Sequence, residues 1–274
     1  MCGEGFVKGD TVFKAYVKPY NTPWREVQAV DADGLAIFEG CIILGRTDTV
    51  RQSHAMLQQQ ALAMPLLLTN PGIETRGAAI IGAQFRWKNR TVPYMLAPDV
   101  PDPDRVNKAI AHWHEKTSIR FVPRDTQTDF LLIKRDQRGC ASMVGRQGGV
   151  QELILGDFCT TGNIIHELGH TVGLWHEQCR IDRDQFIEID LDEVQPSQRH
   201  NFEQRIVETI DLGAYDYGSI MHYPPSAFAV APGAITIKPK KPLPAGVVMG
   251  QRDGLSAGDI ASVEALYATE PKPV

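Results

Sequence analysis

The 274-residue sequence lacks long hydrophobic runs and any excess of basic residues. Its most apolar stretch, Ala61 to Leu68, is short and contains Pro65, whereas a membrane-spanning helix needs about 20 apolar residues. The net charge is -5 and the isoelectric point is near 5.9. Because nucleic-acid-binding proteins normally present a basic surface, this charge argues against that class. We expect no membrane span and no nucleic-acid partner.

Cysteine is scarce too, and the N-terminus has no apolar core of the kind that a signal peptide contains. The chain has five cysteines, so at least one is unpaired or paired between chains. The residues around Lys8, Lys14 and Lys18 form no continuous apolar stretch. Either a signal peptide has been removed or the protein travels without one, and the sequence leaves both routes open.

The remaining composition is that of a globular protein. Hydrophobic residues make up 43% and charged residues 22% of the chain, which excludes disordered, collagen-like and coiled-coil proteins and allows a sizeable core. The length suits one large domain with a smaller part attached.

The N-terminal part has β patterns followed by one helical pattern. Strands over Arg25–Val30 and Leu35–Leu44 predict a hairpin with Asp33-Gly34 at its tip. A helix is expected over Thr49–Ala63. The turn-forming tract from Leu68 to Gly77 then predicts an exposed connector, so we place the domain boundary between residues 1–77 and 78–274.

The C-terminal part alternates between strand and helix patterns and is irregular from Pro224 to Gly254. Helices are expected after Pro103, over Thr161–Leu174 and up to Tyr267. The expected strands are Ala78–Trp87, Val92–Leu96, Ile119–Val122, Phe130–Ile133 and Glu152–Leu155.

The strongest chemical signal is the motif HELGH at residues 166–170. His166 and His170 are four residues apart on a helix, so both imidazoles lie on one face and can bind one zinc ion. Gly173 can take a positive φ and turn the chain, which lets His176 become a third ligand. Three histidines leave the fourth position open, and Glu167 faces it as a general base.

The short motif can arise by chance, and its extension to Gly173 and His176 is what makes it specific. His112 and His114 give a contrast, because they lie beside Trp113 without metal-ligand spacing. We interpret these two as ordinary surface or half-buried histidines.

A second element, SIMHYP, follows at residues 219–224. By itself it could be a turn with a core methionine. Beside the zinc motif, Met221 would give the metal site an apolar floor, and the phenol of Tyr223 could bind the resting metal or donate a hydrogen bond to an oxyanion. His222 is interpreted as structural rather than as a fourth ligand.

These motifs resemble the metzincin metalloproteases, which combine HExxHxxGxxH with a downstream methionine turn. The surrounding residues are similar to the astacin family in particular, and to its bacterial members. The likeness covers roughly Ala78 to Tyr267 and includes His176-Glu177-Gln178, SIMHY at 219–223 and GQRDGLS at 250–256. It implies an α+β, zincin-like protease domain with a twisted sheet, two long helices and an irregular C-terminal subdomain, preceded by a propeptide that contains a β-hairpin.

The resemblance also implies an activity and the residues that carry it. His166, His170 and His176 would bind one zinc ion per chain, Glu167 would be the general base, and Tyr223 would be the mobile tyrosine. The protein would be a secreted zinc endopeptidase, acting as a monomer on proteins or peptides that lie along the edge of its sheet. Export without a leader, or delivery into another cell, remains an alternative route.

The cysteines partly match the family. Cys140 and Cys159 match a family disulfide of the protease domain. A second family disulfide is missing at both ends, since Ser118 stands at one position and Ala268-Thr269 at the other. The chain therefore lacks a link between the first subdomain and the C-terminal helix that is typically worth about 2–4 kcal/mol.

Residues 1–77 resemble a propeptide, with one informative departure. Where the family carries Phe-x-Gly-Asp, with the aspartate on zinc, this chain reads Phe38-Glu39-Gly40-Cys41. A thiolate is a strong zinc ligand, so Cys41 is interpreted as a cysteine switch that keeps the enzyme latent. The alternatives are a buried strand cysteine or a disulfide with Cys2 or Cys179.

Activation would require a cut in the connector from Thr69 to Gly77. The residues from Ala78 to Gly82 are similar to the start of a mature astacin, so Ala78 is the expected new N-terminus, with Glu177 as its partner. The alternative for Glu177 is a surface carboxylate.

Two other classes of function compete with the protease. One is a binding module in which zinc is only structural, and the other is zinc hydrolysis of non-peptide substrates. The open fourth position and the presence of Glu167 argue against a structural site, which is usually closed by four protein ligands.

Overall fold

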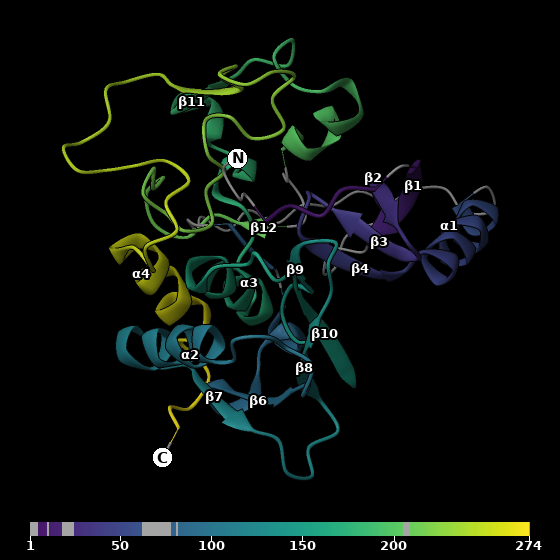
Figure 1. The fold of residues 1–274 in the computed structure, drawn as a ribbon, viewed down its shortest axis with the longest axis vertical. Helices are drawn as coiled ribbons and strands as arrows, with labels where there is room; N and C mark the ends of the chain where they lie inside the picture. Colours follow the sequence, from purple (N-terminus) through teal and green to yellow (C-terminus); the bar gives the residue numbers. More distant parts are fainter. Residues whose placement is uncertain are drawn as a thin grey trace.

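The computed structural model describes residues 5–9, 11–17, 25–61, 78–80, 82–204 and 209–273. One nine-stranded sheet organises them (Figure 1). Its spatial order is β1 (Thr11–Val17), β2 (Arg25–Ala32), β3 (Leu35–Phe38), β4 (Ile42–Arg46), β9 (Cys140–Ser142), β10 (Val150–Leu155), β8 (Phe130–Arg135), β6 (Thr91–Leu96) and β7 (Arg120–Pro123). The N-terminal region, residues 1–77, thus contributes four strands that join the others at β9.

The sheet is mixed, and its polarity changes at the junction. Strands β1 to β4 pair antiparallel with one another, while β4 runs parallel to β9. β9 and β10 are antiparallel, and β10, β8, β6 and β7 are parallel. The α+β class expected from the sequence is confirmed.

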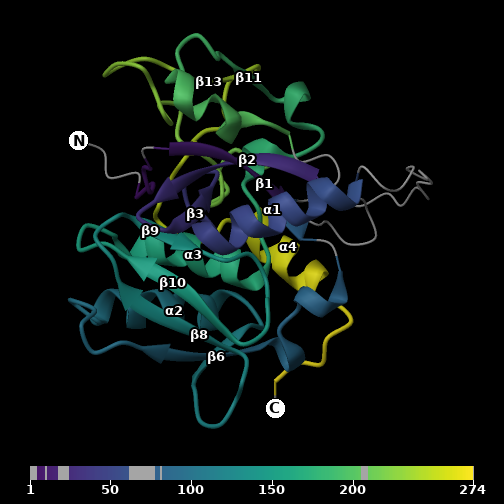
Figure 2. The same ribbon diagram turned by 90° about the vertical axis from the view of Figure 1, so that its right-hand side faces the viewer.

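The described residues contain four α-helices: α1 (Thr47–Ala61), α2 (Asp104–Lys116), α3 (Thr161–Val172) and α4 (Ala257–Leu266). α1 packs against β1 and β4, whereas α2 and α3 lie side by side over the other strands (Figure 2). Trp113 on α2 is fully buried, and its Nε1 donates to the Ile165 carbonyl of α3 at 3.1 Å. The two helices therefore share one apolar core with the sheet.

Local signals define both ends of α3. Thr160 Oγ1 accepts from the Asn163 amide at 3.2 Å, and Asn163 Oδ1 accepts from the Thr160 amide at 2.9 Å. This reciprocal cap satisfies amides that a helix start leaves without partners. At the other end Gly173 has φ 113°, a left-handed conformation that glycine adopts without a Cβ penalty. The turn redirects the chain toward His176.

The remaining elements are short. β5 (Ala79–Ile80) pairs with β12 (Thr209–Ile210), and β11 (Ile187–Ile189) pairs with β13 (Ile237–Pro239). The 3-10 segments are Ala83–Phe85, Lys88–Arg90, Glu177–Cys179, Arg183–Gln185 and Pro196–Phe202. Between residues 224 and 254 the only element is β13, so the irregular C-terminal subdomain has the expected character.

Two expected strands are wrong. Leu35–Leu44 is two antiparallel strands, β3 and β4, because the chain turns at Glu39 and Gly40 with φ values of 48° and 70°. A Cβ on Gly40 would lie 2.6 Å from the Phe228 ring, so this turn needs glycine. Ala78–Trp87 is a strand only at Ala79–Ile80 and continues as a 3-10 segment.

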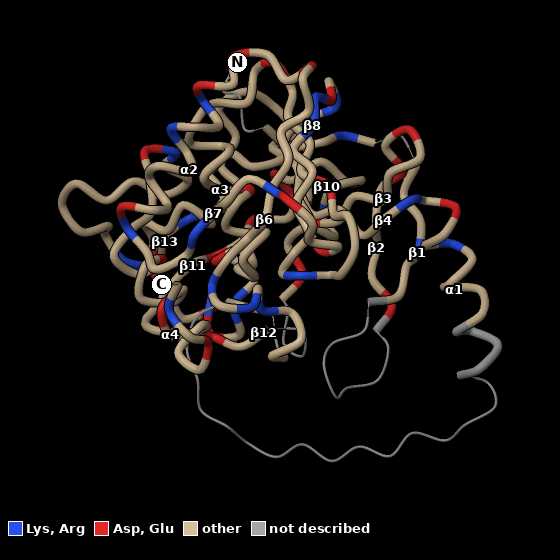
Figure 3. Tube along the Cα trace, turned by 90° about the horizontal axis from the view of Figure 1, so that it is seen from below, with Lys and Arg blue, Asp and Glu red and all other residues tan. Residues whose placement is uncertain are grey.

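None of the helices in the described residues is long and apolar enough to cross a membrane. Acidic and basic residues are interspersed along the chain (Figure 3), consistent with the modest net charge of -5.

Candidate metal centre

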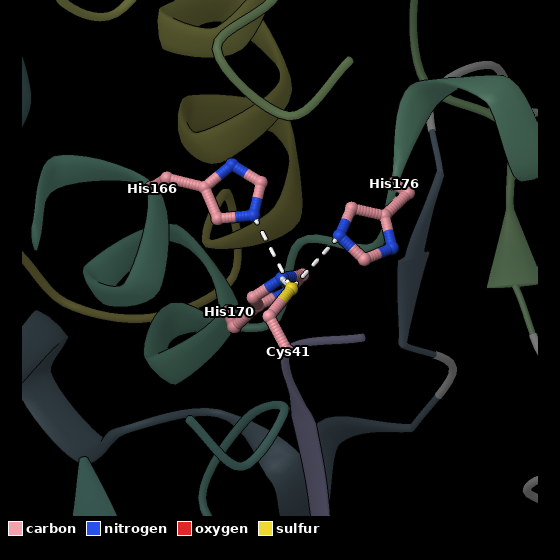
Figure 4. Close-up of side chains that lie close together, drawn as sticks. All are labelled: Cys41, His166, His170 and His176. Atoms are coloured by element: carbon pink, nitrogen blue, oxygen red, sulfur yellow. Dashed lines mark hydrogen bonds between the residues drawn. The ribbon is translucent and has the colours of Figure 1, made fainter. Parts of the chain in front are cut away.

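Three histidines and one cysteine converge on a single point (Figure 4). α3 presents His166 and His170, the turn after Gly173 presents His176, and the turn between β3 and β4 presents Cys41. The Cys41 Sγ lies 3.6, 3.3 and 3.1 Å from the Nε2 atoms of His166, His170 and His176. A tetrahedral zinc site with ordinary bond lengths separates sulfur from nitrogen by about 3.6 Å. The donor set therefore fits one zinc ion.

Each imidazole is oriented by a hydrogen bond at its other nitrogen. Nδ1 of His166 donates to the Ile220 carbonyl and Nδ1 of His170 to the Leu174 carbonyl, both at 2.8 Å. Nδ1 of His176 donates to the Glu39 carboxylate at 2.8 Å. A proton on Nδ1 leaves the Nε2 lone pair free, which is the arrangement that metal-bound histidines require.

Burial keeps these rings in the metal-binding state. His166, His170 and His176 are all almost fully inaccessible to solvent. Burial lowers the pKa of His166 and His170 well below the ordinary value, so both rings are neutral near pH 7. Burial also raises the pKa of the Cys41 thiol in the absence of a cation. A bound metal reverses that effect, because it stabilises the thiolate.

Glu167 lies beside this point on the same helix. Its side chain is 2% exposed, and its Oε2 atom has no hydrogen-bond partner among the described residues. Burial raises the pKa of this carboxyl well above its ordinary value. A buried carboxyl oxygen of this kind needs a polar partner, which water or a metal site would supply.

Met221, the residue of the expected methionine turn, lies against the helix that carries His166 and His170. Met221 is 2% exposed, and a Cβ on Gly169 would lie 2.7 Å from its Sδ atom. The glycine between the two helical histidines therefore allows the thioether to approach the helix closely. His222 is structural, with Nε2 accepting from the Tyr215 hydroxyl at 2.7 Å and Nδ1 donating to the Tyr223 carbonyl at 2.6 Å.

Tyr223 contacts the N-terminal region directly. Its ring centroid lies 4.6 Å from that of His176, and its hydroxyl donates to the Glu39 carbonyl at 2.6 Å. Glu39 is completely buried and accepts from both residues, one through its carboxylate and one through its carbonyl. Sequence reasoning did not assign Glu39 a role. Its position two residues before Cys41 was the available signal.

The N-terminal region also occupies the edge of β9. The Ser142 amide donates to the Cys41 carbonyl at 2.9 Å, and the Cys140 amide donates to the Gly5 carbonyl at 2.8 Å. Two chain segments that are far apart in the sequence thus take adjacent outward-facing amides of one strand.

The structure contains the Cys140–Cys159 disulfide that the family resemblance implies. Cys41 and Cys179 are both buried thiols, so they are not bonded to each other. The Cys179 Sγ accepts from Gln178 Nε2 at 3.7 Å. Cys2 lies outside the described residues, as does the connector from Thr69 to Gly77.

Ala78 and Glu177 lie on neighbouring segments. The Ala78 carbonyl accepts from the Trp175 amide at 2.9 Å, two residues before Glu177 in the chain. The Glu177 carboxylate accepts from the Asp216 amide at 2.8 Å and lies 3.5 Å from the Arg180 guanidinium. It is 8% exposed, and burial raises its pKa to about 8. The alternative of a surface carboxylate is wrong.

The two histidines of α2 do not reach the metal-binding cluster. His112 Nε2 accepts from the Leu255 amide at 3.0 Å, and His114 Nε2 accepts from the Phe121 amide at 2.9 Å. Both link α2 to neighbouring segments, in keeping with their interpretation as ordinary half-buried residues.

Comparisons with known proteins agree with this geometry. The family model described as Astacin, a peptidase family, matches residues 80–268. Zinc metalloproteinase nas-13 of Caenorhabditis elegans is 39% identical over 195 residues, covering 69% of this chain and 42% of the relative. Tolloid-like protein 2 of Mus musculus is 36% identical over 218 residues, covering 73% of this chain and 21% of the relative. The chain thus spans less than half the length of these two relatives.

A solved structure gives the same result. High choriolytic enzyme 1, a hatching enzyme zinc-protease from the medaka fish Oryzias latipes, superposes with a TM-score of 0.59 at 32% sequence identity. The match covers 75% of this chain and 99% of that one. It extends the likeness from sequence motifs to the fold of three quarters of the chain.

Proposed function

The chain belongs to the astacin family, and from this premise we propose that residues 78–274 are a zinc endopeptidase and residues 1–77 its inhibitory propeptide. The observation that carries the proposal is the convergence of three histidine Nε2 atoms beside a buried carboxyl, one oxygen of which has no hydrogen-bond partner in the described part of the chain. Such a set supports hydrolysis, because three protein ligands leave one position for the reaction.

The chain's own residues divide the chemistry among them. His166, His170 and His176 would hold the metal, which when bound would polarise a carbonyl and lower the pKa of water. Glu167, which follows His166 on the same helix, would take a proton from the attacking water and pass it to the leaving amine. Tyr223, once its hydroxyl is released from Glu39, donates to the oxyanion.

Latency follows from what the propeptide occupies. Cys41 takes the fourth ligand position, so no water can be activated there. The Glu39 carbonyl holds the Tyr223 hydroxyl, and Gly5 and Cys41 take the edge amides of β9. A peptide substrate would need the same amides, because extended peptides bind by adding a strand to a free sheet edge.

Activation would follow cleavage in the connector from Thr69 to Gly77, with Ala78 as the new N-terminus. The new ammonium group would form close to Glu177, given the Trp175–Ala78 hydrogen bond. A cation there would stabilise the Glu177 carboxylate and lower the pKa that burial now raises. N-terminal sequencing of the activated protein tests this, and a start well away from Ala78 contradicts it.

We also propose that the protein acts as a monomer outside the cell on proteins or peptides. The Cys140–Cys159 disulfide supports an oxidising compartment, since such bonds are rare in the reducing cytosol.

The catalytic proposal is tested with Glu167→Ala in protein activated by limited proteolysis. We expect peptide cleavage to fall by a factor of about 10²–10⁴ while one zinc per chain is retained. Glu115→Ala, at an exposed position on α2, is the matched control and should leave cleavage unchanged. If activated wild type and Glu167→Ala are equally inert on a broad peptide library, the binding-module alternative wins.

The latency proposal is tested by replacing zinc with cobalt in the uncleaved protein. A thiolate ligand gives cobalt a sulfur-to-metal charge-transfer band, so wild type should show the band and Cys41→Ala should lose it. Cys179→Ala, which removes a second free buried thiol of the described residues, should keep the band. Absence of the band from wild type contradicts the cysteine switch.

A further inference from the structure

Phe6 packs on aromatic residues next to the metal-binding cluster. Its ring is stacked on Phe228, with centroids 4.5 Å apart and planes 16° apart. It meets Tyr223 edge-on at 4.9 Å. Phe202 lies behind both, with its centroid 6.1 Å from that of Phe228 and 5.9 Å from that of Tyr223. We name Phe202, Tyr223 and Phe228 the aromatic platform.

Backbone hydrogen bonds fix Phe6 over this platform. The Gly5 carbonyl accepts from the Cys140 amide at 2.8 Å, and the Val7 amide donates to the Gly40 carbonyl at 2.7 Å. The first bond uses an edge amide of β9, two residues from the Ser142 amide that the Cys41 carbonyl takes. Gly5, the residue before Phe6, is hydrogen-bonded to the edge strand β9. Phe6 therefore has the position that a substrate side chain would have if the residue before it were bound to the same edge.

The platform belongs entirely to residues 78–274, so removal of residues 1–77 would uncover it. Phe228 is only 6% exposed while Phe6 and Gly40 cover it. Losing that cover would leave an aromatic face beside the metal-binding cluster, since the Tyr223 ring lies 4.6 Å from that of His176. An aromatic side chain regains the stacking energy there, whereas a carboxylate meets the negative face of the rings.

We propose that the aromatic platform is a substrate subsite that takes an aromatic side chain close to the scissile bond, as Phe6 does in the uncleaved chain. This inference rests on the proposed endopeptidase function, because it uses the same metal centre and sheet edge. Phe228 is its specificity-determining residue, because its ring makes the stacked contact.

The test is a set of peptides of one parent sequence assayed with the activated protein. Phe, Ala or Asp is placed in turn at each of the three positions on either side of the scissile bond. At one position we expect Phe to raise kcat/KM about tenfold over Ala, with Asp below Ala. Failure to cleave any peptide contradicts the proposed function itself. Cleavage with no aromatic preference at any position overturns only the subsite.

The variant Phe228→Leu keeps an apolar side chain but removes the stacking ring. It should lower the Phe-to-Ala ratio of kcat/KM severalfold, and this ratio divides out any effect that the variant has on the cleavage of both peptides alike. Phe158→Leu, which changes an exposed ring on another part of the surface, should keep the ratio. An unchanged ratio in Phe228→Leu overturns the assignment of Phe228. If that variant does not fold, the peptide series with the wild-type protein still tests whether an aromatic subsite exists.

Discussion

Glu39 makes two hydrogen bonds that connect the N-terminal region to the catalytic residues. Its carboxylate accepts from His176 and its carbonyl accepts from Tyr223. A carboxylate on the far nitrogen of a metal-bound histidine orients the ring and raises its basicity, and losing such a partner typically weakens metal binding about 10–100-fold.

We therefore predict that Glu39→Ala weakens zinc binding in the uncleaved protein about 10–100-fold. The measurement is competition with a coloured chelator. Glu39→Gln should lose less zinc affinity than Glu39→Ala, because the glutamine amide oxygen can still accept a hydrogen bond from the His176 Nδ1–H. After cleavage and removal of residues 1–77, wild type and both variants are the same molecule and should bind zinc equally. Equal zinc affinity of the three uncleaved proteins would refute the role of Glu39.

His222 gives a pH-dependent prediction. Burial lowers the pKa of its imidazole to about 4, whereas the ordinary value is 6.5. The unfolded chain therefore binds a proton at His222 more readily than the folded chain does. The stability that the neutral His222 contributes is complete above pH 6.5 and is lost as the pH falls toward 4. Between pH 7 and pH 4.5 the loss is about 2–3 kcal/mol.

The measurement is the free energy of unfolding in urea at the two pH values, for wild type and His222→Gln. The variant keeps a hydrogen-bonding side chain but has no titrating group at this position. Between pH 7 and pH 4.5 its free energy of unfolding should therefore fall by about 2–3 kcal/mol less than that of wild type. The zinc ligands contribute equally to both proteins. Identical losses in wild type and variant would contradict the prediction.

At the scale of elements, a polar cluster joins α4 to the start of the protease part where the second family disulfide is missing. Arg90 is 4% exposed, and its Nη1 lies 2.7 Å from the Glu264 carboxylate on α4. Glu264 also accepts from the Ser118 amide at 2.7 Å and from its hydroxyl at 2.9 Å. Arg90 further donates to the Glu270 carbonyl at 3.0 Å. Ser118, at one of the missing cysteine positions, thus takes part in a non-covalent link.

We predict that Glu264→Ala lowers the free energy of unfolding by about 2–3 kcal/mol, because it leaves the buried Arg90 cation without its carboxylate. Chemical denaturation measures the effect. Glu115→Ala removes the exposed pair with Lys116 and should change stability by less than about 0.5 kcal/mol. If the two variants are equally stable, the cluster does not link these elements.

The elements that the sequence predicted well are those whose signals are local. The cap at Thr160 and the left-handed Gly173 define α3 within two residues of its expected end. The turn at Glu39 and Gly40 was missed because apolar residues continue on both sides of this single Glu-Gly pair, from Leu35 to Phe38 and from Cys41 to Leu44. The steric need for glycine at position 40 comes from Phe228, which lies 188 residues away in the chain and leaves no local pattern.

The same distinction holds for the site. Spacing alone identified the three histidines, since a helix and a hinge bring them together. Cys41 was found only through the family resemblance. Glu39 and Phe6 were missed because their roles depend on partners more than 130 residues away, such as His176 for Glu39.

At the scale of the whole molecule, the described residues between 5 and 61 form strands and a helix that pack on the rest of the chain. Four strands of the main sheet and α1 belong to them, and their buried residues Val30, Leu35 and Ile37 share a core with Ala141 and Ile154 of the protease part. This non-covalent interface does not depend on the connector.

If residues 1–77 are an inhibitory propeptide as proposed, cutting the connector would not by itself free the metal centre. Before the cut, the inhibitor is tethered at a fixed effective concentration, and after it the two pieces obey mass action. We predict that freshly nicked protein shows low activity per molecule at high concentration and gains activity on dilution. The excised piece added back in trans should restore inhibition. Activity that is proportional to concentration immediately after nicking would show instead that the scission itself is the switch.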